Sequence, residues 1–146
     1  MAKVSTYLNF AGEAEAAGTF YKNVFDTEFD GEISRFGDLP PVEDMPPLPE
    51  DEKNWIMHLS LTIMGGHTLM LSDVATSWGG DGLVKGNNFY ISLHPDTRAD
   101  ADRLFAALSE GGKVESEMSE EFWGDYFGSL KDRFGVQWMV STQSKD

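Results

Sequence analysis

The chain has 146 residues, no cysteine and a formal net charge of −14 at pH 7. A chain of this length forms one domain or two small modules. Without thiols it has no disulfide, thiolate metal site or cysteine nucleophile, which fits a cytoplasmic location. Its negative field repels phosphate backbones and anionic headgroups, so we expect neither nucleic acid nor a membrane as a partner, whereas cationic ligands would be attracted.

The first half of the chain predicts one helix among four strands. Residues 3–10 alternate between apolar and polar side chains, as in a half-buried strand. Residues 12–25 carry apolar side chains at helical spacing. Three further strands are predicted at residues 27–36, 55–64 and 67–73.

An acidic, proline-rich segment at residues 37–54 interrupts this series. It contains five of the six prolines and six carboxylates, and proline lacks the N–H group that a sheet needs. Long loops inside a small domain are often functional. We therefore expect residues 40–53 to form a loop that could close over a pocket.

The second half repeats the organisation of the first. A strand is predicted at residues 87–93 and a helix at 96–112, where Thr97 and Asp100 resemble a capping box. Four apolar side chains share one face of this helix: Ala101, Leu104, Phe105 and Leu108. Short strands follow at residues 113–118, 122–131 and 136–142.

The two halves therefore indicate duplication of one βαβββ module. We expect an α+β fold in a single domain over residues 1–146, with the first module at about 1–75 and the second at about 87–146. Residues 73–86 are rich in turn formers and are expected to connect the modules.

Three stretches carry a resemblance to a known family: "YLNFAGEAEAAGTFYKNVF", "HTLMLSD" and "FWGDYFGSLKDRFGVQWMV". Together they resemble the PhnB-like branch of the vicinal oxygen chelate (glyoxalase/bleomycin resistance/dioxygenase) superfamily. The resemblance implies two βαβββ modules whose curved mixed sheets surround a small-molecule cavity, often in a homodimer. Some proteins of this branch are labelled demethylubiquinone methyltransferases, but the chain has no glycine-rich turn for a nucleotide cofactor.

Metal-dependent members of that superfamily place His or Glu ligands on the first, fourth, fifth and eighth strands. Carried over by resemblance, those positions hold Ser5, either Leu71 or Ser72, Tyr90 and Met139. A catalytic divalent metal needs at least three ligands with basic lone pairs. We therefore expect no standard metal site, and no other cofactor.

His58 and Asp73 are the candidate catalytic residues. His58 lies on the more polar face of its predicted strand and could shuttle a proton or bind a ligand. Asp73 ends the following strand and could orient the His58 ring. The alternatives are a histidine satisfied by a neighbouring strand or solvent, and an aspartate that binds backbone N–H groups, which is its commoner role.

Tyr7, Tyr90 and Trp123 are the candidate ligand-binding residues, because aromatic rings in a cavity can stack on a flat or cationic ligand. Tyr126 belongs to the same aromatic set, whereas Trp138 is expected in the core. Aromatic residues in small β-rich proteins are more often core than site, and Tyr7 and Tyr90 are favoured because they share the face of the predicted ligand positions.

The sequence thus predicts a PhnB-like small-molecule-binding protein in a homodimer, and it leaves open whether a reaction is catalysed. One alternative is a metal-dependent lyase or dioxygenase with non-standard ligands. Another is a sequestering protein of the antibiotic-resistance type, for which the negative charge would suit a cationic drug.

Overall fold

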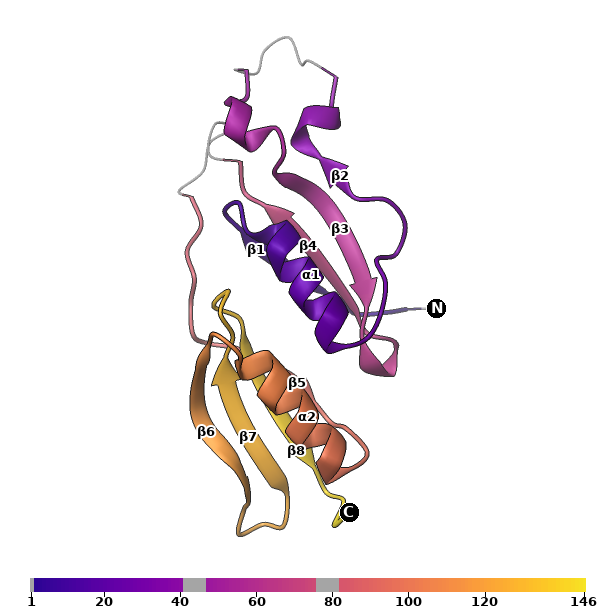
Figure 1. Cartoon of the computed structure of the whole chain (residues 1–146), viewed down its shortest axis with the longest axis vertical. Helices are drawn as coiled ribbons and strands as arrows, with labels where there is room; N and C mark the ends of the chain where they lie inside the picture. Colours follow the sequence, from indigo (N-terminus) through magenta and orange to yellow (C-terminus); the bar gives the residue numbers. More distant parts are fainter. Residues whose placement is uncertain (1, 41–46, 76–81) are drawn as a thin grey trace. The chain divides into compact units, whose positions relative to one another are not determined.

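Each half of the chain folds into a four-stranded mixed sheet with one helix packed on one face (Figure 1). The computed structural model describes residues 2–40, 47–75 and 82–146. Within it the chain divides into unit 1, Met1–Val84, and unit 2, Lys85–Asp146.

Unit 1 has the strand order β1-β4-β3-β2, in which β1 and β4 are parallel and the other pairs are antiparallel. Its elements are β1 (Thr6–Phe10), α1 (Ala14–Val24), β2 (Ser34–Arg35), β3 (Ile56–Thr62) and β4 (Thr68–Asp73), with short 3-10 turns η1 (Phe36–Asp38), η2 (Glu50–Glu52) and η3 (Met64–Gly66).

The core of unit 1 lies between α1 and one face of its sheet. The strand register places Leu8, Leu71 and Leu59 in one row across β1, β4 and β3, and all three are buried. The face of α1 that packs on them includes Gly18, where an added Cβ would lie 3.1 Å from the Leu59 side chain. The absence of a side chain there lets the helix approach the leucine row closely.

Unit 2 has the equivalent order β5-β8-β7-β6, in which β5 and β8 are parallel. Its elements are β5 (Ile91–Leu93), α2 (Arg98–Ser109), β6 (Lys113–Glu120), β7 (Tyr126–Lys131) and β8 (Gln137–Thr142). Each unit therefore runs strand, helix, strand, strand, strand, which confirms the predicted α+β fold of two βαβββ modules.

The core of unit 2 follows the sequence pattern of α2. The helix buries the four predicted side chains, Ala101, Leu104, Phe105 and Leu108. The Thr97 side chain accepts a hydrogen bond from the Asp100 N–H at 3.1 Å, which is one of the two bonds of the predicted capping box. Trp138 on β8 is fully buried, as expected.

Three predicted strands are shorter in the structure. Residues 27–36 contribute only β2, because Asp26 and Gly31 adopt positive φ angles of 49° and 79° that break the extended chain. Residues 87–93 contribute only β5. Residues 122–125 form a turn before β7, closed by a hydrogen bond of 2.8 Å from the Glu121 N–H to the Asp125 carbonyl.

Parts of two predicted connections lie outside the described residues. Positions 41–46 fall within the expected loop at 40–53, and positions 76–81 fall within the expected connection between modules. Neither helix in the described part of the chain has the length and apolar character needed to cross a bilayer.

Candidate functional site

Among the described residues, the helix of each unit packs on one face of its sheet and no helix of that unit covers the other face, which we call the helix-free face. In unit 1 the register sets Tyr7, Met70 and Ser60 side by side across β1, β4 and β3 on that face. These residues alternate with the buried leucines of the helix-covered face. The helix-free face is thus mixed in character, with an aromatic, a thioether and a hydroxyl in one row.

Tyr7 and His58 come together on this face. Their ring centroids lie 6.2 Å apart with an angle of 37° between the planes. The Tyr7 side chain is 50% exposed and His58 is half-buried, so both can meet a ligand from solution. A phenol and an imidazole placed this way offer a stacking surface together with hydrogen-bond donors and acceptors.

Asp73 lies on the opposite, helix-covered face, in register with Phe10. Its carboxylate accepts hydrogen bonds from the N–H groups of Gly12 at 2.8 Å and Ala14 at 3.0 Å, and from that of Ile56 at 2.8 Å. The structure places no hydrogen bond between Asp73 and His58 in the part of the chain that it describes. The two candidate catalytic residues therefore lie on different faces, and the observed contacts of Asp73 match its structural alternative.

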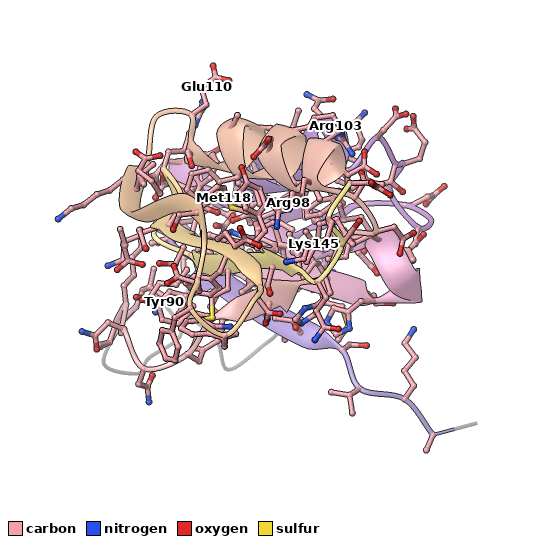
Figure 2. The ribbon with its side chains drawn as sticks, turned by 90° about the horizontal axis from the view of Figure 1, so that it is seen from below. Tyr90, Arg98, Arg103, Glu110, Met118 and Lys145 are labelled. Atoms are coloured by element: carbon pink, nitrogen blue, oxygen red, sulfur yellow. The ribbon has the colours of Figure 1, made fainter. Side chains whose placement is uncertain are left out.

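The helix-free face of unit 2 carries the equivalent row Ser92, Met139 and Ser129 across β5, β8 and β7. Tyr90, next to β5, lies on the side of the sheet away from α2 (Figure 2). Its hydroxyl donates a hydrogen bond of 2.9 Å to Glu115 Oε1. This hydrogen bond, more than the accompanying desolvation, raises the pKa of the Tyr90 hydroxyl, which stays protonated at neutral pH.

Trp123 and Tyr126 lie apart from that row. Trp123 belongs to the turn between β6 and β7, with its side chain 55% exposed and its ring edge-to-face with Phe122 at 4.9 Å. Tyr126 lies on the side of α2, where its hydroxyl donates a hydrogen bond of 2.6 Å to Asp102. Of the predicted aromatic set in unit 2, Tyr90 is the one beside the helix-free row.

The side chains at the family's metal positions do not fit a divalent metal. Leu71 packs in the core, so Ser72 is the fourth-strand residue on the helix-free face, and its hydroxyl donates to Asn9 Oδ1 at 3.1 Å. Tyr90 is a protonated phenol and Met139 a thioether, both weak ligands for such an ion. Within the residues that the structure places, no three His, Cys, Asp or Glu side chains form a group that could hold a metal ion.

Sequence reasoning missed Glu115, the hydrogen-bond partner of Tyr90. Glu115 lies where the pairing of β6 with β7 shifts by one residue, between Val114 and Ser116. Regular alternation cannot assign a face to a residue at such an irregularity. Met70 was also overlooked, although its position between Tyr7 and Ser60 follows from the alternation of β4.

Comparison with known proteins gives a family and several relatives. The Glyoxalase/Bleomycin resistance protein/Dioxygenase superfamily matches residues 3–140. Protein YjdN of Escherichia coli K12 is 31% identical over 143 residues, covering 94% of this chain and 93% of its own.

Several solved structures match almost the whole chain, among them the following two. Protein PA1353 from Pseudomonas aeruginosa has a TM-score of 0.79 and 35% identity, with 98% of each chain covered. A Bacillus cereus PhnB protein, described as a putative 3-demethylubiquinone-9 3-methyltransferase, has a TM-score of 0.75 and 24% identity, with 97% of this chain and 99% of its own covered. At that identity the second likeness shows the fold alone.

Proposed function

The chain belongs to the Glyoxalase/Bleomycin resistance protein/Dioxygenase superfamily, and from this premise we propose that it binds an organic small molecule at the helix-free face of unit 1, without the superfamily's divalent metal. The observation that carries the proposal is the Tyr7–His58 pair, two rings with centroids 6.2 Å apart on the helix-free face of unit 1. Aromatic and polar groups that converge in this way are typical of ligand sites.

In this proposal Tyr7 supplies a stacking surface and His58 a hydrogen bond to the ligand. If a reaction takes place, His58 is the acid–base group, because imidazole is the side chain whose ordinary pKa lies nearest to neutral pH. Asp73 would orient the His58 ring only after a rearrangement that brings its carboxylate from the helix-covered face to the helix-free face. Tyr90 and Trp123 remain predicted ligand-binding residues, and both belong to unit 2.

Three further features of the proposal rest on the sequence and the family. We expect a homodimer, since the resemblance implies one, and a cytoplasmic location, which fits the cysteine-free composition. A metal-dependent lyase or dioxygenase is disfavoured by the donor set, because hydroxyls, a protonated phenol and a thioether replace the expected imidazole and carboxylate ligands.

A thermal-shift screen of a metabolite library, with Mn²⁺, Zn²⁺ and Ni²⁺ tested separately, would examine this proposal. A ligand at 100 times its dissociation constant adds about 2.7 kcal/mol to the free energy of unfolding. Calorimetry then compares His58→Ala with His67→Ala, the matched control. His67 lies in the same unit, and its ring nitrogen is 2.8 Å from the Thr6 hydroxyl.

We expect His58→Ala to weaken binding of the hit at least about tenfold, the scale of one lost hydrogen bond at a ligand, and His67→Ala to leave it unchanged. Equal loss in both variants, or none in His58→Ala, would contradict the proposal. Turnover of the hit by the unaltered protein would make it an enzyme, and tight binding of a drug without turnover would favour sequestration.

A further inference from the structure

A pocket of about 340 Å³ lies within unit 2 and is lined by residues of that unit. Three strand ends converge on it: β5 and β8, which are parallel, end there, and β7 begins there. The residues that line it are His94, Pro95, Asp125, Ser141, Thr142 and Gln143. The loops that follow the carboxyl ends of adjacent parallel strands place their side chains around one pocket.

The lining is mixed, with polar side chains and the apolar ring of Pro95, and it carries one sign of charge. Asp125 is the one residue of the lining that is charged when histidine is neutral, and Ser141 and Gln143 contribute uncharged oxygen acceptors. The His94 ring nitrogen lies 3.2 Å from the Ser92 hydroxyl, so this ring is held by its own strand. A ligand that enters therefore meets a carboxylate surrounded by neutral acceptors.

Asp125 is held in position and keeps acceptor capacity. Its carbonyl accepts the Glu121 N–H at 2.8 Å, which fixes the backbone of the turn. Its carboxylate accepts the Trp123 indole N–H at 3.2 Å through Oδ2. Because a carboxylate has about four lone-pair sites, this single bond leaves room for charge-assisted bonds to a ligand.

The nearby cations are engaged by another carboxylate. Lys145 and Arg98 both donate to Glu120 Oε1, at 2.7 and 3.1 Å, and Figure 2 shows the two labelled side chains close together beside the sheet. Lys145 also reaches the Gly124 carbonyl at 3.4 Å. These cations hold the C-terminal residues to Glu120, and neither lines the pocket.

An exposed aromatic pair stands beside the pocket. Phe122 is 96% exposed and Trp123 is 55% exposed, and the Trp123 indole bonds directly to the pocket carboxylate. A large apolar side chain that is almost fully exposed to water contributes no hydrophobic stabilisation to the fold. An indole face next to a carboxylate is, however, a combination that attracts an organic cation, through the ring quadrupole as well as the charge.

We propose that this pocket is a second binding site, for a small organic cation with a primary ammonium group. The ammonium binds Asp125 and the neutral acceptors of the strand ends, and the hydrocarbon part of the ligand lies against the Trp123 ring. This site shares Trp123 with the predicted ligand-binding residues, but it uses neither Tyr7 nor His58, which carry the proposed function. Binding that is lost in Asp125→Asn and kept in His58→Ala, or the reverse, therefore distinguishes the two sites.

Benzylammonium is the test probe, with benzyl alcohol and benzoate as the neutral and anionic counterparts. The probes are titrated into the ¹⁵N-labelled full chain, and the Trp123 indole N–H resonance is followed. Trp123→Phe identifies that resonance among the four tryptophans. We expect saturable shifts with benzylammonium, with a dissociation constant on the order of 1 mM for a ligand of this size.

Asp125→Asn removes one charge from the pocket, and Glu117→Gln removes one from an exposed site on β6 that does not line it. We expect Asp125→Asn to weaken benzylammonium binding at least about tenfold and Glu117→Gln to change it less than about twofold. An unchanged melting temperature and spectrum of Asp125→Asn verify that it folds.

Three outcomes would overturn the inference. The first is the absence of saturable shifts at the Trp123 resonance. The second is equally tight binding of benzoate or benzyl alcohol, which would show that charge does not select the ligand. The third is an equal effect of Asp125→Asn and Glu117→Gln, which would show that only the net charge of the chain matters.

Discussion

The Asp73 carboxylate at the end of β4 accepts a hydrogen bond of 3.0 Å from the N–H of Ala14, the first residue of α1. The same carboxylate also accepts the N–H groups of Gly12 and Ile56. It therefore joins the start of the helix to two strands of the sheet. Asp132 in unit 2 is used in a comparable way, since it accepts two backbone N–H groups and the Trp138 indole N–H.

Asp73→Asn should mainly destabilise the fold. The side-chain amide would point an N–H group at one of the backbone N–H groups that the carboxylate now accepts. We expect the free energy of unfolding to fall by about 2–4 kcal/mol, because hydrogen bonds to a buried charged group are lost. Urea denaturation measures the change.

Asp30→Asn is the matched control, because the Asp30 carboxylate accepts from the hydroxyl of Thr62 at 2.8 Å and is exposed. A hydroxyl can turn to donate or accept, so this variant should lose less than about 1 kcal/mol. If Asp73→Asn instead kept full stability and lost ligand binding, Asp73 would be the orienting partner of His58.

Gly128→Ala should destabilise unit 2, because the chain passes very close to its neighbours at Gly128. An added Cβ would lie 2.6 Å from Met118 Sδ and 2.8 Å from Phe105 Cε2. Overpacking of this kind costs about 1–3 kcal/mol, and the better strand propensity of alanine offsets about 0.5–1 kcal/mol of it. We expect a net loss of about 1–2 kcal/mol by urea denaturation. Gly86→Ala, whose Cβ would meet only the Asn88 side chain at 3.6 Å, should lose nothing.

The parts of the fold that could be predicted from sequence are those that a local pattern determines. The four apolar positions of α2 recur at helical spacing and Thr97 marks its start, so both its buried face and its cap were predicted correctly. His58 was likewise placed on the more polar face of β3, and the neighbouring Leu59 on the other face is buried. In these segments one periodicity fixes which side chains are buried.

The parts of the site that could not be predicted depend on contacts between distant segments. The partners of Asp73 come from residues up to 61 positions away, and no local pattern reveals them. Trp123 was assigned to a strand. In the structure a hydrogen bond between Glu121 and Asp125 closes a turn there, and the strand begins only at Tyr126. A boundary that moves by a few residues changes where every aromatic side chain near it points.

The ion pair between Glu15 and Arg35 predicts a small acid-sensitive contribution to stability. Two hydrogen bonds, of 3.1 and 2.6 Å, join the side chains, and hydrogen bonding from Arg35 lowers the pKa of Glu15 below 4.5. A carboxylate whose pKa is lowered by folding stabilises the folded state at neutral pH. This contribution is lost as the pH falls from about 4.5 through the pKa of the folded state.

Glu15→Gln should therefore lower the free energy of unfolding at pH 7 by about 0.5 kcal/mol, since both side chains are partly exposed. The difference from the unaltered protein should shrink as the pH falls below about 4. Urea denaturation at several pH values measures both. Glu32→Gln, at an exposed position, is the control, and an equal change in that variant would contradict a role for the pair.

Chelator treatment should leave the protein unchanged. The family's metal positions hold hydroxyls, a protonated phenol at Tyr90 and a thioether at Met139, which are weak ligands for a divalent ion. We expect elemental analysis of the purified protein to find no stoichiometric metal, and dialysis against EDTA to shift the melting temperature by less than about 1 °C. Stoichiometric metal whose removal lowers the melting temperature or abolishes ligand binding would restore the metal-dependent alternative.

The Glu115 carboxylate accepts the hydrogen bond of the Tyr90 hydroxyl and raises its pKa, and this relation can be tested directly. Its hydrogen bond of 2.9 Å raises the pKa of Tyr90 above the ordinary value of 10.0. Glu115→Gln should therefore lower the pKa of Tyr90 toward that value, because an amide holds the phenol proton less strongly than a carboxylate does. Ultraviolet titration of tyrosinate, with Tyr90→Phe to identify its contribution, measures the shift.

The same relation fixes the direction of a stability change at high pH. A group whose pKa is raised on folding contributes stability that is fully present below its unfolded value, near 10, and is lost as the pH rises through the folded value. Glu115→Gln should remove part of this alkaline loss. Only a deprotonated Tyr90 would be a good metal ligand. At neutral pH the phenol keeps its proton, so added Mn²⁺ should not bind the variant. Binding of Mn²⁺ to the variant at neutral pH would show instead that Glu115 suppresses a metal site at Tyr90.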